Sequence, residues 1–95
     1  MHHISEKIKN GARVIDVRSP MEFSGGHFKG AVNIPVQEMT YRMHEFGSKD
    51  DSIVVYCASG SRSSMARMFL NQAGYRDVIN GGGISSMMSV AQSMN

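Results

Sequence analysis

The chain has 95 residues, of which 41% are apolar and 19% are charged. This length fits one domain with a thin core, so we expect a single domain over residues 1–95. The apolar share excludes a chain that is disordered for lack of hydrophobicity. Ten Lys and Arg residues against eight Asp and Glu residues leave a formal charge of +2 without any block of like charges. Nucleic acid is therefore not an expected partner.

A single cysteine, Cys57, excludes an intramolecular disulfide and a metal site built from several thiolates. The sequence implies no metal and no other cofactor. No stretch approaches the ~20 apolar residues of a transmembrane helix, and residues 1–7 lack the apolar core of a secretory signal. We therefore expect a cytoplasmic protein that does not engage a membrane.

The N-terminal segment predicts a short helix followed by a strand. Ser5 is a good N-cap residue, and Gly11 can adopt the left-handed conformation that ends a helix. These two residues predict a helix over 5–10. The β-branched run within residues 13–17 indicates a strand, and this strand ends on charged side chains.

A capping box marks the start of the next helix. Ser19 supplies the cap, Pro20 suits the first helical position, and the carboxylate of Glu22 can reach back to the cap. A pair of glycines ends this helix soon afterwards. Residues 31–34 then predict a second strand, which stops at a proline because proline cannot donate a backbone hydrogen bond.

From residue 36 onward, apolar stripes at helical spacing alternate with further strands. The three stripes are Val36, Met39, Met43 and Phe46; Ala66, Phe69, Leu70 and Ala73; and Ile84, Met87, Met88 and Ala91. We interpret them as the core-facing sides of three helices. Residues 53–56 form a β-branched run without alternation, which is typical of a strand buried on both faces of a parallel sheet. Residues 77–79 predict another strand.

Strands that alternate with helices in so short a chain predict an α/β fold. We expect a small, mainly parallel central sheet of roughly four to five strands, flanked by helices on both faces. Sites in such sheets lie beyond the carboxyl ends of the strands. Residues with useful chemistry follow three of the predicted strands, at 16–18, 57–63 and 80–83. We therefore expect the functional site at this edge of the sheet.

The loop after Cys57 carries the strongest chemical signal. Its small residues allow the backbone N–H groups to turn toward one point, and the N-terminus of the following helix lies behind them. Gly60 permits a positive φ, and Arg62 adds a permanent cation. The converging N–H groups and the cation should both lower the pKa of Cys57 below its ordinary value of ~8.5 and make the thiolate a nucleophile. The structural alternative is that Cys57 is a small buried core residue.

The spacing between the cysteine and the arginine separates two chemistries. Cysteine-dependent phosphatases use the pattern Cys-x5-Arg, whose loop is wide enough for a tetrahedral phosphoryl group. Here Cys57 and Arg62 are separated by one residue fewer, and a tighter ring of N–H groups suits a single sulfur atom better than a phosphate. The spacing favours sulfur transfer over phosphatase or arsenate reductase chemistry.

Segments spread along residues 12–88 also follow a known pattern. They are residues 14–18 (VIDVR), 22–23 (EF), 26–35 (GHFKGAVNIP), 56–63 (YCASGSRS), 74–75 (GY) and 82–87 (GGISSM). In this order and spacing they resemble the rhodanese (thiosulfate sulfurtransferase) family. The main departure is Met87, which stands where that family usually has Trp.

The resemblance implies a rhodanese-like fold and a double-displacement mechanism. The thiolate of Cys57 takes the outer sulfur of thiosulfate or a related small anion, and the resulting persulfide passes it to cyanide or to a thiol acceptor, thioredoxin-like proteins included. The substrate-binding residues would be those of the loop, namely Ala58, Ser59, Gly60, Ser61, Arg62 and Ser63. Arg62 would bind the sulfonate end of thiosulfate, and its structural alternative is a salt bridge in the first turn of the helix.

Two charged residues at the end of the first strand are candidates for a supporting role. Asp16 and Arg18 could orient the loop or the substrate, or Asp16 could simply accept backbone and arginine hydrogen bonds. The glycine run at 81–83 lacks the spacing of a phosphate-binding motif and is expected to let the backbone pass close to the cysteine loop. Besides the sulfurtransferase, a non-catalytic persulfide carrier or interaction module and, less favoured, a cysteine-dependent phosphatase or arsenate reductase remain alternatives.

Overall fold

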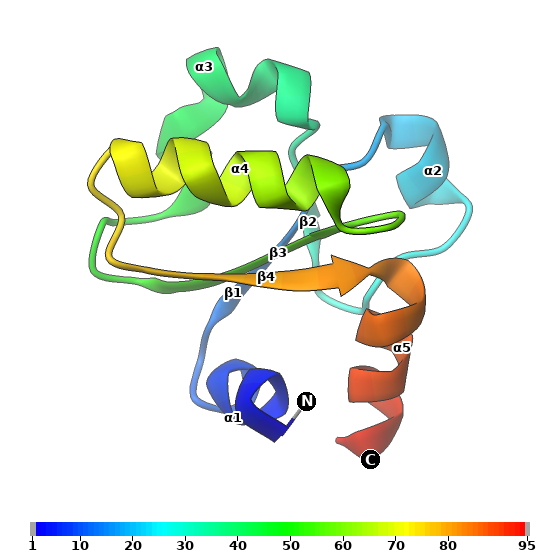
Figure 1. Cartoon of the computed structure of the whole chain (residues 1–95). Coiled ribbons are helices and arrows are strands. Elements are labelled where there is room, and N and C mark those ends of the chain that lie inside the picture. Colours follow the sequence, from blue (N-terminus) through cyan, green and yellow to red (C-terminus); the bar gives the residue numbers. More distant parts are fainter. Residues whose placement is uncertain (1, 95) are drawn as a thin grey trace.

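Four strands of the computed structural model, which describes residues 2–94, pair into one parallel sheet (Figure 1). The strands are β1 (Arg13–Asp16), β2 (Val32–Asn33), β3 (Ser52–Cys57) and β4 (Asp77–Gly83). Their order in the sheet is β2-β1-β3-β4, and every neighbouring pair runs parallel. Since β3 lies inside the sheet, its β-branched run is buried on both faces, as predicted. The predicted α/β fold is confirmed.

Helices cover both faces of this sheet. They are α1 (His2–Lys9), α2 (Pro20–Ser24), α3 (Met39–Arg42), α4 (Ser61–Gln72) and α5 (Ile84–Ser93), with the 3-10 helices η1 (Val36–Glu38) and η2 (Met43–Phe46) on either side of α3. Figure 1 shows α3 and α4 on one side of the sheet and α1 and α5 on the other.

Alternation along β3 divides the core between the two faces. Ile53, Val55 and Cys57 belong to the cluster that packs under α3 and α4. Val54 and Tyr56 belong to the cluster on the opposite face, which the apolar residues of α1 and α5 complete. Each fully buried large side chain contributes about 1.5–3 kcal/mol to folding. Cys57 is therefore anchored by the best-packed strand of the sheet.

The first helix begins earlier than Ser5, so the prediction that Ser5 caps it was wrong. Helix α1 already includes His2–Lys9, and Ser5 is a buried residue inside it. The reason is tertiary packing, because Ile4 and Ile8 lie one helical turn apart and both pack against the core cluster under α1. The predicted end of the helix is confirmed, since Gly11 adopts a φ of +98°.

The stripe from Val36 to Phe46 faces the core as expected, but it does not form one α-helix. The chain passes through η1, α3 and η2. Val36 and Met39 are three residues apart, as are Met43 and Phe46, and a 3-10 turn brings residues at this spacing onto one face. The four-residue step between Met39 and Met43 falls on α3. Local spacing thus explains why the segment alternates between two helix types.

Helix α4 buries a face that differs slightly from the predicted one. Ala66 and Leu70 are fully buried, and Ser63 joins them on the same side. Phe69 is 38% exposed and lies at the edge of the buried face, so its assignment to the core was wrong. The inclusion of Ser63 matters for the site, because it places a hydroxyl beside the end of β3.

Strand β4 is longer than the predicted segment 77–79 and runs on through the glycine triplet. It contains an irregularity, since Asn80 pairs with Val55 whereas Gly82 pairs with Tyr56, which leaves Gly81 as the extra residue. A Cβ atom at Gly81 would lie 2.6 Å from the sulfur of Met87. A Cβ atom at Gly83 would lie 2.5 Å from the backbone carbonyl oxygen of Ala58, so the glycines allow β4 to pass close to the cysteine loop, as predicted.

The substitution Gly83→Ala should destabilise the protein by about 1–3 kcal/mol. Its Cβ atom would lie 2.5 Å from the carbonyl oxygen of Ala58, which belongs to the backbone and cannot rotate away. Urea-induced unfolding followed by circular dichroism measures the loss. Gly25→Ala is the matched control, because the nearest atom to its new Cβ lies at an ordinary 3.5 Å. Equal stability of the two variants would contradict the steric argument.

Candidate active site

Cys57 is the last residue of β3, and the loop of residues 58–60 connects it to α4. Its side chain has no exposed surface, whereas the neighbouring Ala58, Ser59 and Ser61 are exposed. Gly60 adopts the predicted positive φ, at +103°. This conformation turns the chain back over the sulfur as the helix begins. The loop thus covers a buried sulfur with an exposed rim.

Three hydrogen bonds converge on the sulfur of Cys57. The backbone N–H of Gly60 lies 3.0 Å from it, and the backbone N–H and hydroxyl oxygen of Ser63 each lie 3.4 Å from it. Burial opposes ionisation of the thiol, but the hydroxyl of Ser63 and the N–H groups of Ser63, Ser59 and Gly60 favour the thiolate more strongly. The pKa of Cys57 is lowered as a result. Hydrogen bonding therefore prepares a nucleophilic sulfur.

Asn80 holds this loop from the adjacent strand β4. Its side-chain oxygen accepts the N–H of Gly82 at 2.9 Å, and its amide nitrogen donates to the carbonyl oxygen of Gly60 at 3.3 Å. The hydroxyl oxygen of Ser63 lies 2.7 Å from the same side-chain oxygen, and its one hydrogen can go either to Asn80 or to the thiolate of Cys57. We predicted that the end of this strand would approach the cysteine loop but assigned no role to Asn80. The sequence feature that could have predicted this role is the position of Asn80, directly before a glycine run at the carboxyl end of the strand that pairs with the strand of Cys57.

Arg62 forms a two-point ion pair with Glu22 of α2. Its two terminal nitrogens lie 2.7 and 3.0 Å from the two carboxylate oxygens. Ser19 also donates its backbone N–H to Glu22 at 2.9 Å, which confirms the predicted capping box. The hydrogen bonds from Arg62 and Ser19 lower the pKa of Glu22 to about 2. The salt-bridge alternative for Arg62 is therefore present in the structure, while its role in binding an anion stays a prediction.

Asp16 and Arg18 form a buried ion pair at the end of β1. Atom Nη2 of Arg18 lies 2.7 Å from the carboxylate of Asp16 and donates to the carbonyl oxygen of Gly26 at 2.7 Å. The guanidinium also lies over the ring of Tyr56, 5.7 Å from its centroid. The hydrogen bond with Asp16 is the largest cause that raises the pKa of Arg18. These contacts tie β1 to the segment after α2 and favour the structural alternative for both residues.

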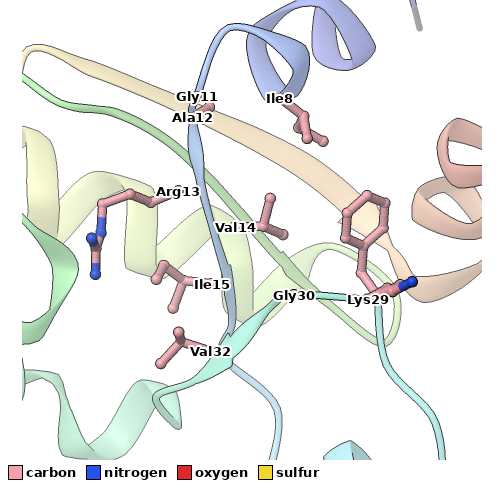
Figure 2. A pocket seen from close by; sticks show the side chains of 10 residues that line it. Ile8, Gly11, Ala12, Arg13, Val14, Ile15, Lys29, Gly30 and Val32 are labelled. Atoms are coloured by element: carbon pink, nitrogen blue, oxygen red, sulfur yellow. The ribbon is translucent and has the colours of Figure 1, made fainter. Parts of the chain in front are cut away.

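A hollow of about 330 Å³ lies against β1, and Figure 2 shows the side chains that line it. Cys57 and the loop after it are not among its lining residues. Its walls come from α1, from β1 and from the segment that leads into β2, and they include Ile8, Val14, Lys29 and Val32.

Within residues 2–94, no three His, Cys, Asp or Glu side chains lie close enough together to hold a metal ion. None of the helices over the same residues is long and apolar enough to cross a membrane.

The fold and the loop define an α/β protein with a buried, activated cysteine between a parallel strand and a helix. Residues 2–88 match the family described as Rhodanese-like domain, and the chain belongs to this family. It is 38% identical over 74 residues to thiosulfate sulfurtransferase PspE of Escherichia coli (strain K12), covering 77% of this chain and 71% of that protein. The predicted resemblance is confirmed.

Two further comparisons extend this result. The structure of the human single-domain sulfurtransferase TSTD1 superposes with a TM-score of 0.83 at 26% identity and covers 94% of this chain and 92% of that one. The putative sulfur carrier protein YrkF of Bacillus subtilis (strain 168) is 37% identical over 67 residues, which is 70% of this chain but only 36% of that protein. The chain is thus similar both to named sulfurtransferases and to part of a named carrier.

Ser63→Ala should raise the pKa of Cys57, because it removes a hydroxyl that stabilises the thiolate. The rate of alkylation by iodoacetamide at neutral pH should fall several-fold, and the alkylation rate profile should shift to higher pH. Ser61→Ala is the control, since Ser61 is an exposed residue of the same helix turn. An unchanged profile for Ser63→Ala would show that the backbone N–H groups alone set the reactivity.

Asp16→Asn should cost about 3 kcal/mol or more of stability, because it leaves the Arg18 guanidinium buried without a carboxylate. The folded variant should keep the alkylation rate of Cys57 if the pair is structural. Glu45→Gln is the control for stability, since it removes a carboxylate from a more exposed pair with Arg42 and should cost far less stability than Asp16→Asn. Lost reactivity in folded Asp16→Asn would instead indicate a role in orienting the loop.

Proposed function

We propose that the chain is a sulfurtransferase that moves a sulfane sulfur from thiosulfate, or a related donor, through a persulfide on Cys57 to cyanide or a thiol acceptor. The observation that carries the proposal is the convergence of the Gly60 and Ser63 donors on the sulfur of Cys57. Membership of the rhodanese-like family and the similarity to proteins named sulfurtransferases support it.

In the first step, the thiolate of Cys57 attacks the outer sulfur of thiosulfate. A new S–S bond forms as the S–S bond of thiosulfate breaks, and sulfite leaves with the bonding electron pair. No general base is needed, because the lowered pKa of Cys57 supplies the thiolate before the donor binds. The thiolate is oxidised to a persulfide as thiosulfate is reduced to sulfite, so the step balances without an external oxidant or reductant, and the outer sulfur remains on the enzyme.

In the second step, the acceptor attacks the terminal sulfur of the persulfide and the thiolate of Cys57 leaves. Cyanide becomes thiocyanate, and a thiol becomes a persulfide after it loses its proton. The backbone N–H groups of the loop, which now surround the thiolate, would stabilise the negative charge of the outer sulfur. A thiol on a thioredoxin-like protein is an acceptor of the same class as a small thiol.

A persulfide carrier is the second candidate, and the similarity to the putative sulfur carrier protein YrkF favours it. A carrier would accept sulfur at the same cysteine but would release it only to a partner protein. The phosphatase or arsenate reductase alternative is less favoured, because the loop between Cys57 and Arg62 is one residue shorter than that chemistry uses.

Incubation with thiosulfate should increase the intact mass of the protein by one sulfur atom, and cyanide should remove this sulfur and yield thiocyanate. Because Cys57 is the only cysteine, the adduct can be assigned without ambiguity. Cys57→Ser is the matched control and should gain no mass. Hydrolysis of p-nitrophenyl phosphate without any sulfur adduct would overturn the proposal in favour of a phosphatase.

The rate of repeated turnover with thiosulfate and cyanide distinguishes a sulfurtransferase from a persulfide carrier. Steady-state formation of thiocyanate over many cycles would support the sulfurtransferase. A stable adduct that cyanide removes only slowly would support the carrier.

A further inference from the structure

Glu22 lies beside the first turn of α4 and pairs with the arginine that is predicted to bind the donor. We propose that Glu22 determines the charge preference of the site, by lowering the affinity of Arg62 for doubly charged donors relative to singly charged ones. This inference rests on the proposed function, and it concerns which sulfur donors that function accepts.

The ion pair occupies the edge of Arg62 that an oxyanion would use. A guanidinium recognises a carboxylate or a similar oxyanion through two parallel N–H···O bonds. Both terminal nitrogens of Arg62 already donate to the two oxygens of Glu22, at 2.7 and 3.0 Å. A sulfonate group must therefore displace the carboxylate or use the remaining donors of the arginine.

Glu22 is also held in place from its other side. Its Oε1 atom accepts the backbone N–H of Ser19 at 2.9 Å, and its own backbone N–H donates to the hydroxyl of Ser19 at 3.2 Å. An anion that displaced the carboxylate from Arg62 would disturb this cap as well. The pKa of about 2 for Glu22 keeps the carboxylate charged at neutral pH. The carboxylate is thus a fixed negative charge next to the loop.

The local charges cancel as a consequence. The pair of Glu22 with Arg62 is neutral, as is the buried pair of Asp16 with Arg18. A donor that approaches Cys57 meets the loop dipoles rather than an uncompensated cation. The repulsion from Glu22 grows in proportion to the charge of the donor, so it acts about twice as strongly on a dianion as on a monoanion.

Direct measurement of thiosulfate binding tests the role of Glu22 without relying on turnover. In a Cys57→Ser background, which cannot accept sulfur, thiosulfate binding is measured by calorimetry with and without Glu22→Gln. We expect Glu22→Gln to tighten thiosulfate binding about 3- to 10-fold. The gain for the monoanion benzenethiosulfonate should be clearly smaller. Glutamine can still complete a capping box, so the variant should keep its fold.

The control is Asp50→Asn in the same background. It removes the same charge from a pair with Arg76, and these two residues lie before the amino ends of β3 and β4, whereas Cys57 is the last residue of β3. Thiosulfate binding should change less than about 1.5-fold, because a six-residue strand at ~3.3 Å per residue separates this pair from Cys57 by more than the Debye length of ~8 Å in physiological salt. Unchanged or weaker thiosulfate binding in folded Glu22→Gln, or equal gains for both anions, would overturn the inference.

The same variants, made in a chain that keeps Cys57, distinguish a failure of this inference from a failure of the proposed function. If thiosulfate binds more tightly to Glu22→Gln but leaves no sulfur on Cys57, the charge effect stands and the proposed function fails. If the sulfur adduct forms but Glu22→Gln does not lower the KM for thiosulfate, the proposed function stands and the role of Glu22 is wrong.

Discussion

The stabilisation of a charged sulfur without access to water is the constraint that organises this protein. Cys57 has no exposed surface, and burial by itself would keep the thiol protonated. The compensation comes from oriented dipoles, namely the N–H groups of the loop and the hydroxyl of Ser63. Such donors act only at hydrogen-bond distance, so the backbone of the loop must be held within tenths of an ångström. The surrounding structure provides this rigidity.

Strand β4 and helix α4 supply most of that support. Ser63 lies on the buried face of α4, and Asn80 of β4 binds both the Ser63 hydroxyl and the carbonyl group of Gly60. The glycines of β4 remove the side chains that would otherwise separate the strand from the loop. The loop is thus held by direct contact between its backbone and that of β4. This arrangement needs no additional layer of side chains, which suits a chain with a thin core.

The parts of the site that follow from local sequence were predictable, and the parts that depend on distant segments were not. The capping box at Ser19, the left-handed Gly60 and the buried strand before Cys57 each depend on a few consecutive residues. The contacts of Asn80 with Ser63 and of Glu22 with Arg62 join residues 17 and 40 positions apart, so only the assembled sheet brings them together. The early start of α1 has the same cause, because its apolar residues pack against another part of the chain.

Charge pairing and dipoles have different roles at this edge of the sheet. The ion pairs of Arg18 and Arg62 each hold a neighbouring segment, the first through Gly26 and the second through the cap of α2. Because each arginine is neutralised by a carboxylate, the net charge of +2 adds little long-range attraction at the cysteine. The thiolate and any sulfur bound to it depend instead on short-range N–H and hydroxyl dipoles, which salt screens far less than it screens exposed charges. Under the proposed function, these dipoles would hold the negative outer sulfur, and Glu22 would set how much charge the donor can bring.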